Sequence, residues 1–168
     1  DPEFVNFLQQ NTEGVMNGDC LDVDVADTIQ ILYMELTGDF ENIDGIQYFN
    51  NLQVLEVIDN PSLTILPVLS GLTSLETLVF FNNPSLTILP ELTSLISLQE
   101  LHILSTHFIS LPNLSELTNL MDLSIYGNDA LLCVGGYPPL FDVSDYPYPI
   151  CPTYCPIDIF FNVFNNCF

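Results

Sequence analysis

The sequence predicts an α/β-type repeat solenoid, in which successive turns of the chain stack along one continuous core. Apolar residues recur with a period of 23 residues through the middle of the chain. The octapeptide Asn-Pro-Ser-Leu-Thr-Ile-Leu-Pro also occurs unchanged at residues 60–67 and 83–90. A single turn of this length cannot bury its own apolar side chains, so successive turns must cover one another. We therefore expect one repeat domain with a cap at each end.

Residues 1–28 predict an N-terminal cap that opens with a short helix. Asp1 is a residue type that caps helices, and Pro2 suits the first helical position. The apolar side chains that share one helical face are Phe4, Phe7 and Leu8. After the helix, the alternation of Leu21, Val23 and Val25 with aspartates predicts a half-buried lead-in strand.

Residues 29–132 carry five copies of the pattern L-x-x-L-x-Φ-x-x-N, where Φ is apolar. The first residues of the five copies are Ile29, Leu52, Leu75, Leu98 and Leu120. The last step is 22 residues and the others are 23. The ninth positions are Thr37, Asn60, Asn83, Thr106 and Asn128. The two threonines depart from the pattern, so we expect local irregularity in the first and fourth copies.

This pattern resembles the leucine-rich repeat family, and more narrowly the short repeats of secreted bacterial surface proteins of the internalin group. The resemblance implies one short strand per repeat, five in all, on a concave face, with the leucines in the core. It also implies that the ninth-position Asn turns inward and bonds to the backbone of neighbouring turns. The family binds its partners on the concave face, which makes that face the expected site.

The segments that return on the convex side contain Pro67, Pro90 and Pro112 at matching places. Proline inside a helix removes a hydrogen bond and clashes with the preceding turn. We therefore expect a mostly non-helical convex side of extended or 3₁₀ segments.

Residues 133–168 predict a disulfide-stapled C-terminal cap rich in proline. Its cysteines are Cys133, Cys151, Cys155 and Cys167. Disulfides are favoured over zinc, although the spacing of Cys151 and Cys155 leaves zinc as an alternative. Cys20 lies at the opposite end of the solenoid and is expected to remain unpaired within the chain. The apolar tail needs a cover, so we predict that it and Cys20 assist assembly; the tail residues singled out are Phe160, Phe161 and Phe164.

The charge is one-sided: the chain has 22 Asp and Glu, no Lys or Arg, and a formal net charge of -22. Binding to phosphate backbones or anionic lipid surfaces requires basic residues, so nucleic acid and membrane surfaces are disfavoured as partners. No apolar run approaches the roughly 20 residues that span a bilayer, so direct membrane insertion is not expected.

The predicted binding residues of the concave face are taken from the outward fifth and seventh positions of the repeats. They are Tyr33, Glu56, Ile58, Val79, Phe81, His102, Leu104 and Tyr126. Ile58, Phe81, Leu104 and Tyr126 should form one exposed apolar row, which favours an interface over mere cross-strand packing.

Catalytic and metal sites have weaker support. Glu56 and Glu76 could approach each other as an acid–base pair, but chance neighbours are expected among so many acids. No Cys/His nucleophilic pair emerges, and we expect neither a catalytic site nor a cofactor. Calcium at a dense acidic segment is the weaker alternative to a solvated edge, with candidates Asp19, Asp22, Asp24 and Asp27.

The sequence therefore predicts an extracellular or cell-surface protein that is not an enzyme and binds other proteins. The favoured hypothesis is a surface or filament subunit that associates with copies of itself. The alternative is an adhesion or recognition domain that binds a foreign protein or glycan through the concave face.

Overall fold

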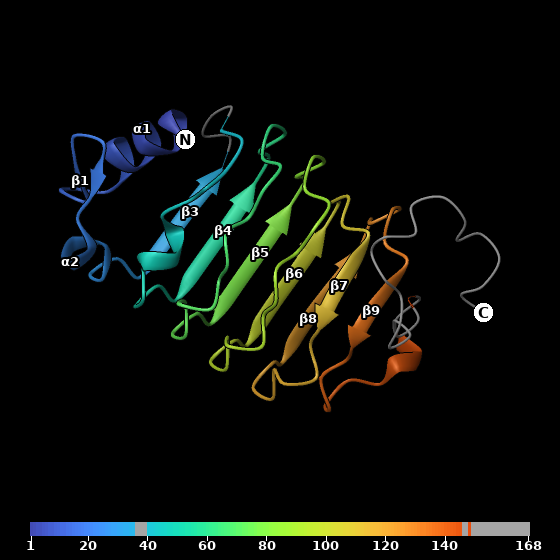
Figure 1. The fold of residues 1–168 in the computed structure, drawn as a ribbon. Coiled ribbons are helices and arrows are strands. Elements are labelled where there is room, and N and C mark those ends of the chain that lie inside the picture. The colour runs from blue at the N-terminus through green and yellow to red at the C-terminus, as the bar shows by residue number, and fades with distance from the viewer. Residues whose placement is uncertain (36–39, 146–147, 149–168) are drawn as a thin grey trace.

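The computed structural model describes residues 1–35, 40–145 and 148, and a five-stranded parallel sheet runs through it (Figure 1). The strands, in their order across the sheet, are β3 (Ile31–Glu35), β4 (Val54–Ile58), β5 (Thr77–Phe81), β6 (Glu100–Leu104) and β8 (Asp122–Tyr126). Each strand starts at the third position of its repeat, and equal repeat positions pair across all four interfaces. The predicted solenoid of five parallel strands is confirmed.

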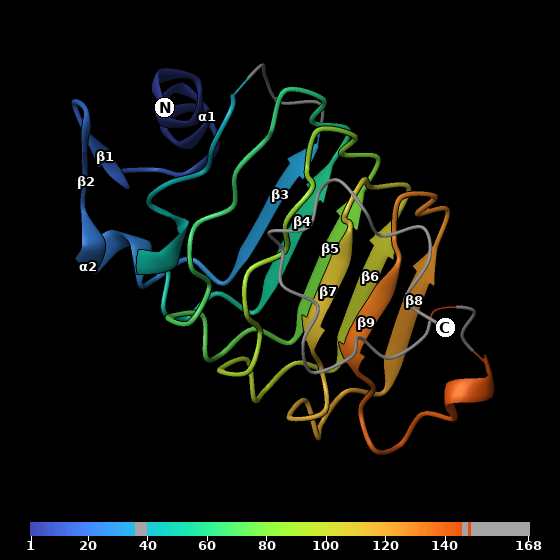
Figure 2. The same ribbon diagram turned by 45° about the vertical axis from the view of Figure 1, so that its right-hand side comes forward.

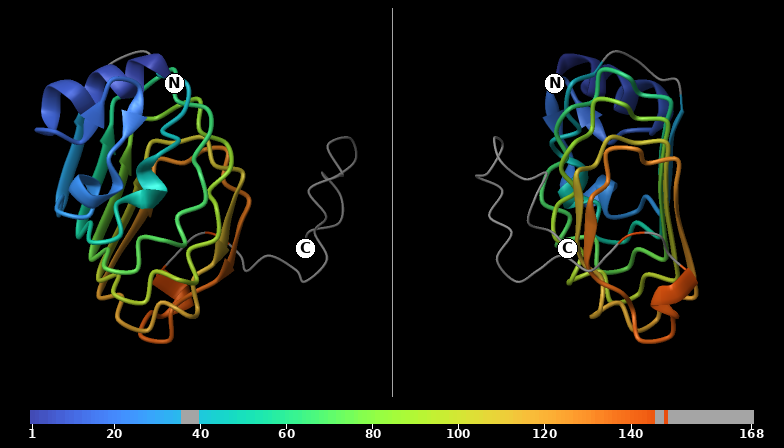
Figure 3. Two further views of the ribbon diagram at one scale, coloured as in Figure 1. Left: turned by 60° about the vertical axis from the view of Figure 1, so that its left-hand side comes forward. Right: turned by 90° about the vertical axis from the view of Figure 1, so that its right-hand side faces the viewer.

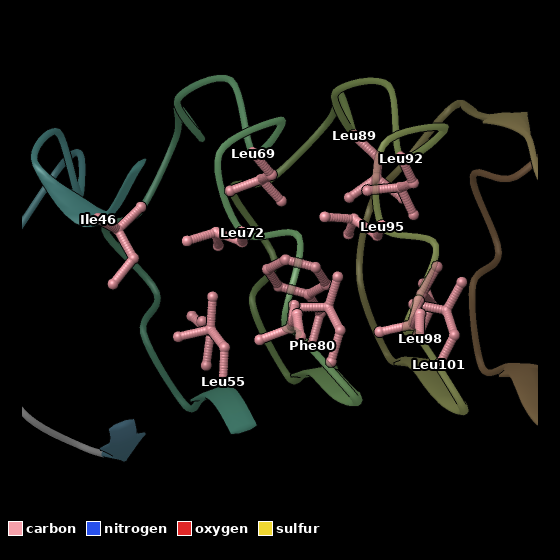
Figure 4. Close-up of a cluster of buried hydrophobic side chains, with 14 of the residues drawn as sticks. Ile46, Leu55, Leu69, Leu72, Phe80, Leu89, Leu92, Leu95, Leu98 and Leu101 are labelled. Carbon is pink, nitrogen blue, oxygen red and sulfur yellow. The ribbon is translucent and has the colours of Figure 1, made fainter. Parts of the chain in front are cut away.

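The core lies between the sheet and the segments that return along the convex side. In each strand the fourth and sixth repeat positions are buried, as at Leu55 and Val57, while the residues between them reach the surface. Leucines of the return segments, such as Leu72 and Leu95, point toward the strand residues from the other side (Figure 4). The repeated leucines therefore form one continuous apolar column.

Buried asparagines hold the turns that follow the strands. The side-chain amide of Asn83 donates to the carbonyl oxygens of Val57 at 2.7 Å and Phe81 at 3.1 Å, and its Oδ1 accepts from the backbone N–H of Asn60 at 3.1 Å. Asn128 forms the equivalent bonds to the turn before it, and Thr106 donates to Asn128 through both its N–H and its hydroxyl. These bonds satisfy backbone groups that the core would otherwise leave unpaired.

The convex side is extended, as the prolines predict. The right-hand view of Figure 3, along the solenoid, shows stacked coils in which most of the chain opposite the main sheet is irregular. The helical piece between β3 and β4 is the 3₁₀ turn η1 (Ile46–Tyr48). Neighbouring returns are joined by side chains at equivalent positions: Ser97 Oγ donates to the Thr73 carbonyl at 2.8 Å, and Asn119 Nδ2 donates to the Ile96 carbonyl at 2.7 Å.

The fourth return differs, because β7 (Ser110–Asn113) pairs in parallel with β9 (Cys133–Gly136) on the convex side, opposite the main sheet (Figure 2). The strands of this second sheet could not be predicted from the repeat pattern. Glycine is required for the close approach: a Cβ added to Gly135 would lie 2.6 Å from the Asn113 nitrogen.

The N-terminal cap contains the predicted helix, α1 (Pro2–Asn11). The Asp1 carboxylate accepts from the backbone N–H of Glu3, and the predicted apolar residues of α1 are buried in the core. The short strands β1 (Met16–Asn17) and β2 (Cys20–Leu21) then form an antiparallel pair.

The predicted lead-in strand is wrong beyond Leu21. Residues Val23–Ala26 form a helical turn, α2, because the Asp22 carboxylate accepts from the backbone N–H groups of Asp24 and Val25. This N-cap bends the chain into a helix where the alternation of apolar and acidic residues predicted an extended strand.

At the C-terminal end, the 3₁₀ turn η2 (Val143–Asp145) follows β9, and the Tyr137 hydroxyl donates to the Tyr148 carbonyl at 2.8 Å. The predicted cap residues beyond position 148 lie outside the described residues. Among the described helices, none combines the length and the apolar character needed to cross a bilayer.

Candidate functional site: the concave sheet face

The five parallel strands present three rows of outward side chains, because pairing places equal repeat positions opposite one another. The third-position row is Ile31, Val54, Thr77, Glu100 and Asp122. The fifth-position row is Tyr33, Glu56, Val79, His102 and Ser124. The seventh-position row is Glu35, Ile58, Phe81, Leu104 and Tyr126. All predicted concave-face residues lie on this one surface.

The seventh-position row contains the predicted run of apolar side chains, which we call the apolar ladder: Ile58, Phe81, Leu104 and Tyr126. Its members are direct register partners on four successive strands. Phe81 is 39% exposed and Tyr126 65% exposed, while Ile58 and Leu104 are half-buried. A contiguous apolar strip therefore reaches the surface across most of the sheet.

The fifth-position row is mixed in character. Tyr33 is 56% exposed, and Glu56, Val79 and His102 are half-buried. The Nε2 atom of His102 lies 3.4 Å from an oxygen of Asp122 on the neighbouring strand. This contact joins His102 of the fifth-position row to Asp122 of the third-position row. It is an ion pair only when the imidazole is protonated.

The third-position row was not among the predicted binding residues, which came only from fifth and seventh positions. The period-two alternation of a strand would have included it. Its two acids, Glu100 and Asp122, are exposed and stand directly opposite each other on β6 and β8. The Thr77 hydroxyl donates to Glu100 at 3.4 Å. No Lys or Arg in the chain can neutralise either carboxylate.

The two carboxylates considered for acid–base chemistry are not register partners. Glu56 stands opposite Val79, whereas Glu76 lies one residue before β5 begins. Glu76 instead borders an open groove of about 420 Å³ at the starts of the strands, with Ser97, Gln99, Asn119 and Met121. The groove offers a single carboxylate among amide, hydroxyl and apolar groups, so it lacks the pair that such chemistry uses.

The candidate calcium aspartates do not converge. The described residues contain no group of three or more His, Cys, Asp or Glu side chains placed to hold a metal ion. Asp22 is occupied as the N-cap of α2, and Asp27 accepts from the backbone and side-chain nitrogens of Asn50 at 3.2 and 3.0 Å. Two of the four aspartates thus have structural roles.

The candidate assembly residues are partly described. Cys20 is exposed on β2 and has a free thiol. Cys133 is buried at the start of β9. The remaining candidates, Cys151, Cys155, Phe160, Phe161, Phe164 and Cys167, lie outside the described residues.

Comparison with known proteins shows similarity to solved structures but not to family models or curated sequences. No protein-family model and no curated protein matches the sequence. The structure is similar to the crystal structure of internalin C2 from Listeria monocytogenes, with 25% sequence identity, a TM-score of 0.46, and coverage of 81% of this chain and 74% of that one. The repeat register and strand pairing by themselves show a solenoid of parallel, in-register strands built from leucine-containing repeats.

Proposed function

We propose that this protein is a non-enzymatic protein-binding module whose concave sheet face holds the partner. The observation that carries the proposal is the apolar ladder, which is in register across four strands and still exposed at Phe81 and Tyr126. Contiguous apolar surface bordered by polar groups marks interaction sites. Burying such surface contributes about 25 cal/mol per Å² to association, before the costs of immobilising the partner.

Outward aromatic residues are well suited to this role. Large side chains on a rigid sheet lose little further entropy when a partner packs on them, and Tyr is among the residue types that dominate binding energy. The strands are fixed by continuous pairing, so the ladder keeps its geometry before the partner arrives. A preformed surface of this kind supports recognition rather than catalysis.

The test is a selection of binders from a displayed library of random peptides on the immobilised protein. We expect most selected peptides to lose binding to Phe81→Asp and to retain it on the matched control Ile88→Asp. Ile88 is 64% exposed but lies in a return segment on the convex side. Both variants should melt within a few degrees of the wild type. Binders that respond equally to both variants would contradict a concave site.

Self-association is a second candidate, favoured by the exposed free thiol of Cys20. We propose that Cys20 of one copy meets a C-terminal cysteine of the next copy, since five turns separate it from that end of its own chain. Such head-to-tail contacts build open chains. Sedimentation of the native protein, with Cys20→Ser as the comparison, tests this: a monodisperse monomer in both samples would remove the filament hypothesis.

We also propose that the protein is extracellular and that a disulfide staples its C-terminal cap. We propose that Cys133 forms the staple with one of the C-terminal cysteines, and these candidate partners lie outside the described residues. Disulfides persist in oxidising compartments outside the cytosol. Peptide mapping after cleavage at Asp or Glu, under non-reducing conditions, would identify the partner of Cys133; a fully reduced set of cysteines in native material would contradict the location.

A further inference from the structure

We propose that the concave face takes a basic amphipathic helix of a partner protein. The apolar stripe of the helix would pack along the ladder, and its Lys or Arg side chains would pair with the carboxylates around the ladder. This inference rests on the proposed function and names the chemistry of its partner. It is carried by the direction of the ladder, the backbone pairing beneath it and the charge of the surrounding residues.

The partner segment is helical because the sheet face offers it side chains and no backbone. The central strands β4, β5 and β6 are each paired on both sides, so their N–H and C=O groups are already used within the sheet. A segment lying across this face must satisfy its own backbone groups, and a helix does so internally. Strand addition requires a free sheet edge, which β4, β5 and β6 do not provide beneath Ile58, Phe81 and Leu104.

The dimensions also fit a helix. The ladder runs perpendicular to the strands from Ile58 to Tyr126, which is three strand spacings or about 14 Å. An apolar stripe at helix positions i, i+3, i+7 and i+10 covers about 15 Å. Four apolar anchors on the helix can therefore meet four apolar residues on the sheet.

The partner is basic because acids lie on the ladder's face of the sheet and the chain has no Lys or Arg to pair with them. Glu35 continues the ladder row and stands opposite Ile58, and Glu56 lies two residues before Ile58 on the same outward face. Glu100 and Asp122 form an acidic pair at the starts of β6 and β8, whose last residues are Leu104 and Tyr126 of the ladder. With no Lys or Arg in the chain, only an incoming partner can supply cations of that kind. Lysine and arginine stems can also cover apolar surface while their charged ends reach outward.

Other occupants are less compatible with this face. A second copy of the chain carries the same net charge of -22 and has no basic side chain to offer. Nucleic acid and anionic lipid would add negative charge to an already acidic surface. The complementary charge therefore favours a basic protein segment over each of these alternatives.

The experiment uses a synthetic helix of about 14 residues with leucine at the stripe positions and lysine elsewhere. Its affinity is measured by fluorescence anisotropy, and its helicity by circular dichroism. Two control peptides are a scrambled sequence of identical composition and a version with glutamate in place of lysine. We expect tight, helix-forming binding of the lysine peptide, at least tenfold weaker binding of the scrambled one, and no binding of the glutamate one.

Two pairs of substitutions separate local from overall charge. Glu35→Gln with Glu56→Gln should weaken the lysine peptide about fivefold, since exposed ion pairs each contribute modestly. Glu91→Gln with Glu116→Gln removes the same charge from exposed sites in the return segments and should change affinity less than about twofold. Equal weakening by both pairs, or equal binding of the scrambled peptide, would overturn the inference.

Variants of the apolar ladder distinguish a failure of the basic-helix inference from a failure of the proposed function. Phe81→Ala and Tyr126→Ala should each weaken the lysine peptide at least tenfold without unfolding the protein. If the ladder variants abolish library binders but the charge variants have no effect on the lysine peptide, the concave site stands and its basic partner is wrong. If neither ladder variant affects either probe, the concave site itself is wrong.

Discussion

The concave and convex sides of the solenoid are built from the same repeats but stabilised in different ways. On the concave side, every strand pairs along five residues with its neighbour. On the convex side, the described pairing is limited to β7 with β9 and an isolated bridge between Asn42 and Ile65. Elsewhere single hydrogen bonds join the returns, some from the backbone, as from the Ile109 N–H to the Thr87 carbonyl, and some from side chains, as from Ser97 to Thr73.

This difference explains why only one side forms ordered rows on its surface. Continuous backbone pairing places equal repeat positions directly opposite, so the outward residues of the strands align. Ile65 and Ile88 also occupy equal repeat positions and are exposed by 61% and 64%, but no continuous pairing extends their row across the described part of the molecule. Equal positions of the sequence repeat form an ordered surface row only where continuous backbone pairing holds neighbouring turns in register.

The largest expected effect comes from removing a core leucine, and it tests whether the two sides of the solenoid contribute equally to the stability of the core. Leu78 on β5 and Leu72 in a return segment are both fully buried. Leu→Ala at either position should cost about 2–5 kcal/mol, depending on how far the surroundings relax into the cavity. We expect Leu78→Ala to cost more, because the paired strand relaxes less than the return. Urea unfolding measures both, and a larger loss for Leu72→Ala would reverse the comparison.

A smaller effect is expected from the convex sheet. Gly135→Ala would place a Cβ 2.6 Å from the Asn113 nitrogen and force β9 away from β7. We expect a destabilisation of about 1–3 kcal/mol, as for overpacking. The control is Leu132→Ala at a 60% exposed neighbour, which should cost less than about 0.5 kcal/mol. Equal thermal shifts for the two variants would show that the β7–β9 contact adds little.

Uncompensated charge affects both sides, and its relief should raise the melting temperature. Molar sodium chloride, or a pH near the sequence pI of 4.1, reduces repulsion among the 22 acids. A gain of about 1 kcal/mol corresponds to roughly 2–4 °C in a chain of this size. Scanning calorimetry across salt concentrations is the measurement, and an unchanged melting temperature would mean that bound ions already neutralise the acids.

Relief of the repulsion between one pair of neighbouring carboxylates should stabilise the protein only at the concave face. Glu100 and Asp122 are opposite like charges, which destabilise a sheet. Glu100→Gln should therefore stabilise the protein at low salt by about 0.2–1 kcal/mol, and the gain should vanish in molar salt. Glu91→Gln on the convex side provides the control. Stabilisation of the same size by both variants would assign the effect to net charge alone.

The smallest expected effect concerns Asp142, after β9. Hydrogen bonds from the backbone N–H and then the hydroxyl of Ser144 lower the pKa of Asp142 below the ordinary value of 3.8. A lowered folded-state pKa contributes stability above the unfolded-state value, and this contribution is lost as pH falls through the folded-state pKa. Asp142 therefore opposes the general gain on acidification. Carboxyl NMR titration should show it ionised at a pH where an exposed, unbonded aspartate is half protonated.

The sequence determined the solenoid because a repeat leaves few alternatives. The spacing of leucines established where each strand begins, which residues are buried and which side chains share an outward row. Phe81 and Tyr126 could be assigned to one surface from the repeat register alone, since parallel in-register stacking is the arrangement that buries all the repeated leucines together. The N-cap at Asp1 could also be predicted from the sequence, because the Asp1 carboxylate bonds only to backbone N–H groups of the next few residues.

The tertiary structure decided the features that depend on partners distant in the sequence or on competition between local patterns. The turn at Asp22 could have been an extended strand by its alternation, and its cap bonds made it helical instead. The pairing of β7 with β9 depends on Gly135 approaching Asn113, a contact that no periodicity encodes.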